Sequence, residues 1–430
     1  MESPMDKLMS PLSPRKSADK PAAASLAEDP VPVKPVCSLE LPTAEERLAA
    51  IARFYSDRVF SLSFDAFDIS AASGGRPLVA VGIIAFERLG LEEVADRAKY
   101  MAWFSAVERA YTDTNAYHNA AHGADVLAGT LTLLSHLDTT LSAPGPAPRG
   151  GAGGGGAAGG AVSKVEALAL VLAAAAHDVG HPGVGNGFLA ATLSPMAVFY
   201  NDESINEMMH ACRAFQIMLE GGGACNVLGK LSRAEFGQAR RIITATILAT
   251  DMAKHGGLLD EFVAAQAACP DVRLWDDKGR LLLFRITLHL ADLMNPVRPW
   301  PLASAYGEGV VSEAARQGDA ERAAGLVPSA MTDRDAICLP AAQLGFMTRF
   351  LKPVLIAFAG VIPDFVIPAA ASFGDTEARW AEMLAAGVRL PPGGCYPPFS
   401  AGIGSDVALR RARAVEEAVA ARDAHWARFG

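Results

Sequence analysis

The sequence predicts an all-α protein, and three observations support this. Apolar residues recur at helical spacing over long segments, 51% of the residues are hydrophobic and supply a large core, and alternating strand patterns are nearly absent. Only "LVAVGII", near residue 80, has a composition typical of a strand. Helices are expected at 91–111, 118–137, 164–178, 203–219, 232–250, 278–293, 341–359 and 376–386.

The domain organisation follows from two segments that lack a helical pattern. Residues 1–42 are rich in Pro, Ser, Ala and Lys, which predicts a disordered leader. The helical pattern begins at "TAEERLAAIARFYSDRVF", where Thr43 is a plausible N-cap with Glu46 three residues later. The Gly/Ala-rich stretch 143–161 has no side chains able to form a core, so we expect a flexible insertion there. A single domain is predicted over 43–425, with a linker between two domains at the insertion as the alternative.

Charge and cysteine content narrow the class of protein. A formal net charge of -9 argues against nucleic acid or an anionic membrane as an electrostatic partner. The six cysteines are scattered and form no C-x-x-C pair, which is typical of reduced thiols in a cytosolic protein. The N-terminus lacks an apolar signal-peptide core, and charge or proline interrupts the most apolar stretches. We therefore expect a cytoplasmic chain without direct membrane insertion, with tethering to a membrane or organelle left open.

Histidines and acidic residues gather in four places beside apolar segments. Burying such groups costs several kcal/mol unless hydrogen bonds, a partner charge or a metal ion pairs with them. Taken singly, a His-x3-His pair can be an accident of surface composition, and an aspartate can simply end a helix. Together they favour a metal site, because His nitrogens and carboxylates suit zinc, whereas carboxylates with water suit Mg²⁺ or Mn²⁺. The four places are "AYHNAAHGADV" with His118 and His122, "AHDVGHPGVGN" with His177, Asp178 and His181, "LHLADLMNP" with His289 and Asp292, and "YNDESINEMMH" with Glu207 and His210.

Six motifs in a fixed order extend this constellation: "YHNAAHGADV", "HDVGHPGVGN", "ATDMAKH", "ADLMNPVRPW", "QGDAER" and "QLGFMTRFLKP". They resemble the ordered signatures of class I 3′,5′-cyclic nucleotide phosphodiesterases, a branch of the metal-dependent HD-domain phosphohydrolases. The likeness runs from about residue 64 to Leu384. It implies a compact multi-helix catalytic domain of the HD-domain fold. It also implies hydrolysis of cAMP, cGMP or both to the 5′-monophosphate, which terminates a cyclic-nucleotide signal.

The resemblance implies a site with two divalent ions. The tight site, usually Zn²⁺, would be held by His122, His177, Asp178 and Asp292. Asp178 would also bridge to a second ion, usually Mg²⁺ or Mn²⁺. Two such ions clamp a phosphate and lower the pKa of a bridging water, so that hydroxide attacks phosphorus at neutral pH.

The resemblance also assigns residues to proton transfer. His118, the first histidine of H-N-x-x-H, matches the general acid that protonates the leaving sugar oxygen. Glu207 matches the carboxylate that orients and charges His118, and His181 matches a histidine close to the phosphate and the activated water. Four further polar residues are supporting candidates that a purely structural role explains at least as well: Asn119, Asp125, His210 and His289.

A purine pocket follows from the last motif. Gln343 matches the glutamine that binds the purine edge, and its amide can face adenine or guanine by presenting opposite ends. Phe346 would stack on the ring with Val310 as the opposite clamp, although helical spacing alone would place both in the core. Further substrate contacts matched by the resemblance are Asn295, Met252, His118 and Asp292.

The chain departs from the family pattern in several places. Gly180 stands where the family mostly has an acidic residue, and Met209 replaces a frequent histidine. Ala303 and Tyr306 stand where Tyr and Trp are more frequent, which puts the pocket shape in doubt. No expected metal ligand and no expected acid is lost, so activity is expected.

Two other functions compete with this interpretation. The first is another HD-type phosphohydrolase, acting on nucleotides or cyclic dinucleotides. Its cyclic-dinucleotide branch should carry a G-Y-P motif, and "CYPPF" near the C-terminus is not that motif. A non-catalytic cyclic-nucleotide binder or scaffold should lack a ligand or the acid. The sequence does not decide whether cAMP or cGMP is preferred, whether the chain forms a homodimer, or whether it is attached to regulatory domains.

Overall fold

The computed structural model describes residues 43–143 and 160–388, and the regular secondary structure in this part of the chain is entirely helical, without strands. The all-α prediction is therefore confirmed. The helices are α1 (Ala44–Tyr55), α2 (Ala66–Ala72), α3 (Pro77–Arg88), α4 (Arg97–Ala110), α5 (Ala120–Ser142), α6 (Lys164–Ala176), α7 (Asn186–Ala191), α8 (Pro195–Tyr200), α9 (Ile205–Leu219), α10 (Arg233–Ile247), α11 (His255–Ala268), α12 (Asp277–Leu293), α13 (Trp300–Ala323), α14 (Leu339–Phe346), α15 (Lys352–Phe358) and α16 (Pro363–Ala385).

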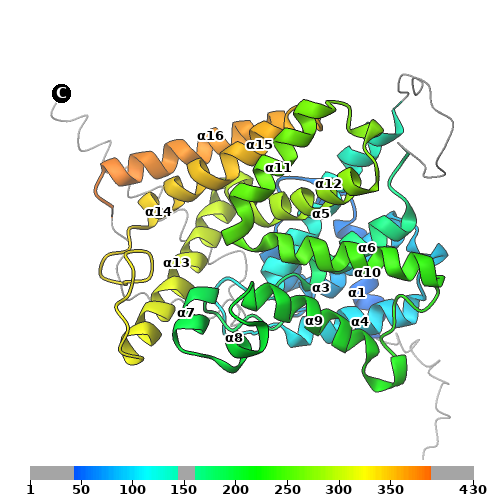
Figure 1. Ribbon diagram of the computed structural model, residues 1–430, viewed down its shortest axis with the longest axis horizontal. Coiled ribbons are helices and arrows are strands. Elements are labelled where there is room, and N and C mark those ends of the chain that lie inside the picture. The colour runs from blue at the N-terminus through cyan, green and yellow to red at the C-terminus, as the bar shows by residue number, and fades with distance from the viewer. Residues whose placement is uncertain (1–42, 144–159, 389–430) are drawn as a thin grey trace, which may run out of the picture. The chain divides into compact units, whose positions relative to one another are not determined.

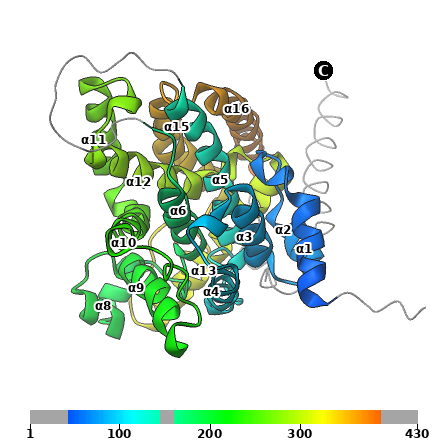
Figure 2. The ribbon, with the colours of Figure 1, turned by 90° about the vertical axis from the view of Figure 1, so that its right-hand side faces the viewer.

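Helices α5 and α6 form the centre of the described unit. α5 packs against α3, α6 and α12, and α10 packs against α6 and α12 (Figures 1 and 2). Every residue of α6 from Val165 to Ala176 is buried, as expected for a helix that is apolar on all faces. A capping box between Ser163 and Glu166 starts this helix, and the predicted box between Thr43 and Glu46 is confirmed at the start of α1.

The "LVAVGII" stretch, whose composition resembles that of a strand, forms helix α3, in agreement with the all-α prediction. Pro77 stands in the first turn, where its fixed φ favours a helix start, and the residues from Pro77 to Phe86 are buried on every side. Complete burial removes the alternation of polar and apolar residues from which a helix is recognised. Gly82 allows the close packing of α4, because a Cβ there would lie 2.5 Å from a ring carbon of Phe104.

Most expected helices are present, with differences at their ends. The expected helix 341–359 corresponds to α14 and α15, which are joined by a π-helical turn at Met347–Leu351. Helix α16 begins well before the expected 376, because Pro368 lies inside the helix without ending it. Helices α2, α7, α8, α11 and α13 were not expected from the sequence.

The predicted leader, residues 144–159 of the predicted insertion, and residues 389–425 of the predicted domain lie outside the described residues. The division into a leader and one domain thus stays a prediction. Both borders of the insertion are held by arginines. Arg273 donates to the carbonyl of Ala143 at 3.3 Å, and Arg280 donates to that of Gly160 at 3.0 Å.

In the described ranges, no single helix has both the length and the apolar character needed to cross a membrane. Helices α2 and α3 pass that test only when taken together, and they are bent by 101°.

Candidate functional site

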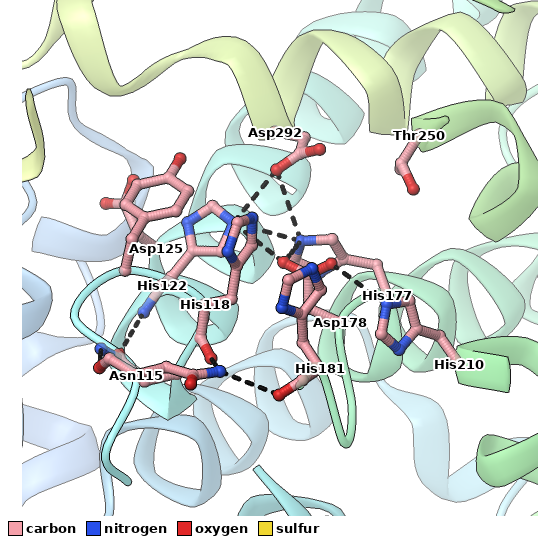
Figure 3. A network of polar contacts seen from close by, with 12 residues as sticks. Asn115, His118, His122, Asp125, His177, Asp178, His181, His210, Thr250 and Asp292 are labelled. Carbon is pink, nitrogen blue, oxygen red and sulfur yellow. Dashed lines mark hydrogen bonds and ion pairs between the residues drawn. The ribbon is translucent and has the colours of Figure 1, made fainter. Parts of the chain in front are cut away.

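Four side chains that could hold a metal ion converge where three helices begin or end (Figure 3). His122 lies in the first turn of α5, which Asn119 caps by accepting from the backbone N–H groups of Ala121 and His122. His177 and Asp178 directly follow α6, and Asp292 lies in the last turn of α12. The structure therefore brings together all four expected ligands of the tight site.

The separations between the ligand atoms fit one small ion. His122 Nε2 lies 3.1 Å from Asp292 Oδ1, 3.3 Å from Asp178 Oδ2 and 3.3 Å from His177 Nε2. His177 Nε2 lies 3.1 Å from Asp178 Oδ2 and 3.4 Å from Asp292 Oδ1. Ligands at about 2.0–2.1 Å from a tetrahedral ion are separated by about 3.3–3.4 Å, so two imidazoles and two carboxylates at these spacings suit zinc.

The surroundings set the protonation of these ligands. Nδ1 of His177 donates to the carbonyl of Ala174 at 2.9 Å, so Nε2 is the nitrogen directed at the ligand cluster, and it becomes available to an ion when its proton is lost. Burial by itself would raise the pKa values of Asp178 and Asp292, but the charge of His177 and other neighbouring imidazoles lowers both. Both carboxylates are therefore ionised at neutral pH, as metal ligands must be.

The other carboxylate oxygen of Asp178, Oδ1, faces the ring of His210. His210 donates through Nδ1 to the carbonyl of Val179 at 2.9 Å, and its Nε2 lies 3.6 Å from Asp178 Oδ1. Burial lowers the pKa of His210 to about 4 and outweighs the attraction of Asp178, which by itself would raise it. The ring is therefore neutral, and Nε2 is an acceptor. Two acceptors face each other, and His210 Nε2 has no hydrogen-bond partner in the described part of the chain. Such a pair suits a water or a cation between them.

His118 is held by Glu313 rather than by Glu207. Nδ1 of His118 donates to Oε1 of Glu313, whose other oxygen accepts from the backbone N–H groups of Tyr117 at 3.0 Å and His118 at 3.2 Å. Burial by itself would lower the pKa of His118, but the charge of Glu313 and then that of Asp178 raise it to about 9. His118 is therefore an imidazolium at neutral pH.

The expected pairing of Glu207 with His118 is wrong. Glu207 accepts from the amide of Asn186 at 2.9 Å, and burial raises its pKa to about 7. Glu313 was missed because it comes from α13, far from His118 in sequence. A signal was nevertheless present, since Glu313 is an acidic residue on the apolar face that includes Val310 and Ala314.

His181 lies against His118, and its ring stacks on that of His118 with centroids 3.9 Å apart. The amide of Asn115 joins the two segments, because it donates to the carbonyls of both His118 and His181 (Figure 3). The pKa of His181 lies well below its usual range, with burial as the larger cause and the charge of His118 as the next. Nδ1 of His181 accepts from Gly183 at 3.0 Å, so the neutral ring carries its proton on Nε2.

A cavity of about 540 Å³ joins the metal-ligand cluster to the expected purine pocket. Gln343 is 7% exposed, and its side-chain amide makes no hydrogen bond to any described residue. The residues expected to contact substrate all line this one cavity: His118, Met252, Asp292, Asn295, Val310, Gln343 and Phe346. The structure thus brings together the residues that the sequence assigned to separate motifs.

Asn295 lines the cavity, but its amide is already bonded. Its Oδ1 accepts from the hydroxyl of Tyr117, and its Nδ2 donates to Asp125 at 3.0 Å. Asp125 in turn pairs with Arg298 at 2.9 Å, and both side chains are 1% exposed. Asp125 and Asn295 therefore hold Tyr117 in the cavity wall, which is a structural contribution to the pocket.

Three of the positions that depart from the family pattern have identifiable surroundings in the structure. Gly180 has a φ of +79°, a conformation that glycine adopts without strain, and the missing Cβ would lie 3.4 Å from the sulfur of Met209. The two unusual residues are therefore neighbours. Tyr306 lines the cavity and packs on the rings of Phe67 and Tyr117.

The chain is similar in sequence to known proteins of one family. The sequence pattern described as 3′5′-cyclic nucleotide phosphodiesterase matches residues 117–368. The chain is 32% identical to mouse 3′,5′-cyclic-AMP phosphodiesterase 4C, with 79% of this chain and 46% of the relative covered. It is 30% identical to mouse high affinity cAMP-specific and IBMX-insensitive 3′,5′-cyclic phosphodiesterase 8A, with 69% of this chain and 36% of the relative covered.

A solved structure is similar in fold. The phosphodiesterase domain of the RhoPDE fusion protein from the choanoflagellate Salpingoeca rosetta superposes with a TM-score of 0.65 at 27% identity. This match covers 78% of the chain and 98% of that domain. The chain spans less than half the length of the two mouse relatives. On the matched family pattern and the ligand geometry, the chain belongs to the class I 3′,5′-cyclic nucleotide phosphodiesterases.

Proposed function

We propose that the chain hydrolyses 3′,5′-cyclic nucleotides, cAMP or cGMP or both, to nucleoside 5′-monophosphates. The observation that carries the proposal is one cavity lined by the metal ligand Asp292, the imidazolium His118 and the free amide of Gln343. A substrate in that cavity meets a metal-ligand cluster, a proton donor and a base-recognition group together. A non-catalytic binder has no need of the first two.

Divalent ions would complete this site: we propose Zn²⁺ held by His122, His177, Asp178 and Asp292, and Mg²⁺ or Mn²⁺ beside Asp178. When bound, such ions neutralise phosphate charge and lower the pKa of a bridging water. The donor set supports this assignment, because His nitrogens with carboxylate oxygens suit zinc and a second carboxylate oxygen suits a harder ion.

His118 supplies the leaving-group proton. The ribose 3′-oxygen is strongly basic, so it must be protonated as its bond to phosphorus breaks. With a pKa of about 9, His118 holds a proton at neutral pH, and Glu313 keeps the ring oriented through Nδ1 so that Nε2 is the donor. His181, neutral and stacked on His118, offers a proton on Nε2 that can bond a phosphate oxygen.

Gln343 and Phe346 bind the purine. The amide of Gln343 presents one donor and one acceptor end, and no described residue makes a hydrogen bond that fixes its orientation. Phe346, one helical turn further along α14, offers a ring face to the base, with Val310 exposed on the other wall. These positions support a planar heterocycle between an aromatic ring and an aliphatic side chain.

The decisive experiment is hydrolysis of both cyclic nucleotides by the purified chain. The protein is first treated with a chelator and then given Zn²⁺ with Mg²⁺ or Mn²⁺. We expect 5′-monophosphate formation that the chelator abolishes and the metals restore. Release of the 3′-monophosphate, or no turnover of either nucleotide in the metal-loaded protein, would contradict the proposal.

A further inference from the structure

We propose that Cys338 is a modification site at which a small disulfide such as glutathione disulfide closes the substrate cavity. This inference rests on the proposed function, because it places the thiol in the wall of the nucleotide site. Cys338 is half-buried, carries a free thiol and lines the same cavity as Gln343 and Phe346. It immediately precedes α14, the helix that carries both of those residues.

The cavity is built to receive a ligand next to this thiol. Gln343, five positions after Cys338, is 7% exposed and its amide has no hydrogen-bond partner in the described ranges. The amide faces the cavity, where a bound molecule can supply its hydrogen-bond partner. Cys338 therefore borders a space that is completed by a bound molecule.

A disulfide can reach Cys338 from solvent. The same cavity is lined by Met331, which is 63% exposed, and by Met252, which is 38% exposed, so it opens to the surface. Among the described residues, the other free thiols, such as that of the exposed Cys212 on α9, do not line the cavity.

The reaction is thiol–disulfide exchange and needs no other oxidant. The thiolate of Cys338 attacks one sulfur of glutathione disulfide, and the S–S bond of glutathione disulfide breaks as the new mixed disulfide forms. The departing glutathione thiolate takes up the proton that Cys338 has lost. The adduct occupies space that the purine needs between Phe346 and Val310, so substrate binding is lost.

The test uses the full chain loaded with metal. The protein is incubated with glutathione disulfide in mildly alkaline buffer, where thiols form the attacking thiolate. The adduct on each cysteine is then quantified by peptide mass spectrometry beside cyclic-nucleotide hydrolysis. We expect activity to fall in proportion to the fraction of Cys338 that carries glutathione, and to return with a phosphine reductant, which does not compete for zinc as a thiol would.

Two variants and one ligand separate this effect from general damage. Cys338→Ser should keep its activity under treatment, whereas Cys212→Ser, which removes an exposed thiol outside the cavity, should lose activity as the parent does. Adenosine 5′-monophosphate should slow modification of Cys338 but not of Cys212. Full modification of Cys338 with unchanged activity, or equal inhibition of Cys338→Ser, would overturn the inference.

Failure of the inference differs visibly from failure of the proposed function. If the chain is not a phosphodiesterase, the untreated protein hydrolyses neither cyclic nucleotide, whatever the state of Cys338. If only the inference is wrong, the untreated protein is active, and either Cys338 resists glutathione disulfide or its adduct leaves turnover intact.

Discussion

Glu313 and His118 lie 195 positions apart in the chain, yet the carboxylate of one accepts the Nδ1 proton of the other. The contact turns a buried histidine, whose pKa burial alone would lower, into an imidazolium with a pKa of about 9. It also fixes the ring so that the opposite nitrogen faces the cavity. A proton donor for the leaving oxygen thus depends on a residue outside the histidine motifs.

The first prediction concerns the pH dependence of turnover. Glu313→Gln removes the carboxylate charge that contributes most to raising the pKa of His118, while the lowering effect of burial remains. The pKa should therefore fall by about 1–3 units. Because His118 must be protonated to act, the alkaline limb of the kcat/KM profile should move to lower pH. Glu207→Gln should leave that limb in place, and an unshifted limb in Glu313→Gln would exclude the pairing from catalysis.

The second prediction separates the acid from the metals by leaving group. General-acid catalysis contributes typically about 10²–10⁴-fold, and only where the leaving group is basic. His118→Ala should therefore lose about that much with a cyclic nucleotide and much less with a nitrophenyl phosphodiester, because nitrophenolate leaves without a proton. Rates are compared at matched metal content. Equal losses on both substrates would instead give His118 a role in positioning phosphate.

The third prediction concerns the metal ligands. Asp178→Ala or Asp292→Ala leaves the cluster with three of its four converging ligand atoms. Each variant should lose bound zinc by elemental analysis and lose turnover of both substrates named above, since the nucleophile depends on the metals. Asp260→Ala removes an exposed carboxylate on α11 and serves as the control, with metal content and activity unchanged. Full zinc occupancy in either ligand variant would refute the assignment.

The fourth prediction concerns the insertion. Replacing residues 144–159 by a short Gly/Ser linker should leave folding and basal activity nearly intact, because loop length affects stability only logarithmically. The border is held independently, since the N–H of Val162 donates to Asp138 of α5 at 2.9 Å. Thermal unfolding and hydrolysis measure the result, and a collapse of stability would show that the insertion packs on the domain.

Arg280→Ala provides the contrasting change at the same border. Arg280 pairs with Glu166 at 2.8 Å, and the two side chains are only 10% and 8% exposed. Removing one member of a buried pair leaves an uncompensated charge and costs about 3–5 kcal/mol. Denaturant unfolding should show that loss for Arg280→Ala and nearly none for Lys278→Ala, an exposed cation in the same helix.

The fifth prediction concerns base recognition. Gln343→Ala removes the amide but leaves Phe346 to stack, so KM for cyclic nucleotides should rise while zinc content stays the same. Thr348→Ala, an exposed position just beyond α14, should leave KM unchanged. Unaltered kinetics of Gln343→Ala with both nucleotides would exclude this amide from the pocket.

The sequence by itself determined the helical class, the start of α1 and the gathering of ionisable residues beside apolar runs, from which the family resemblance selected the four expected metal ligands. These depend on local information: apolar residues at helical spacing, the Thr43–Glu46 capping box, and ionisable residues placed beside apolar runs. Such patterns report which residues share a face or are costly to bury. They are therefore readable without knowing what lies opposite them.

Only the tertiary structure decided the partners. The family resemblance indicated Glu207 as the partner of His118, but packing of α13 brings Glu313 there instead. The "LVAVGII" stretch could not be recognised as a helix from the sequence, because its residues are buried on all sides and the polar–apolar periodicity of a helix is therefore missing. The cavity joins Cys338 and Gln343 of the α14 region to Asp292 of α12. The physical reason is the same in each case: a side chain's environment is set by segments distant in sequence, and local spacing carries no information about them.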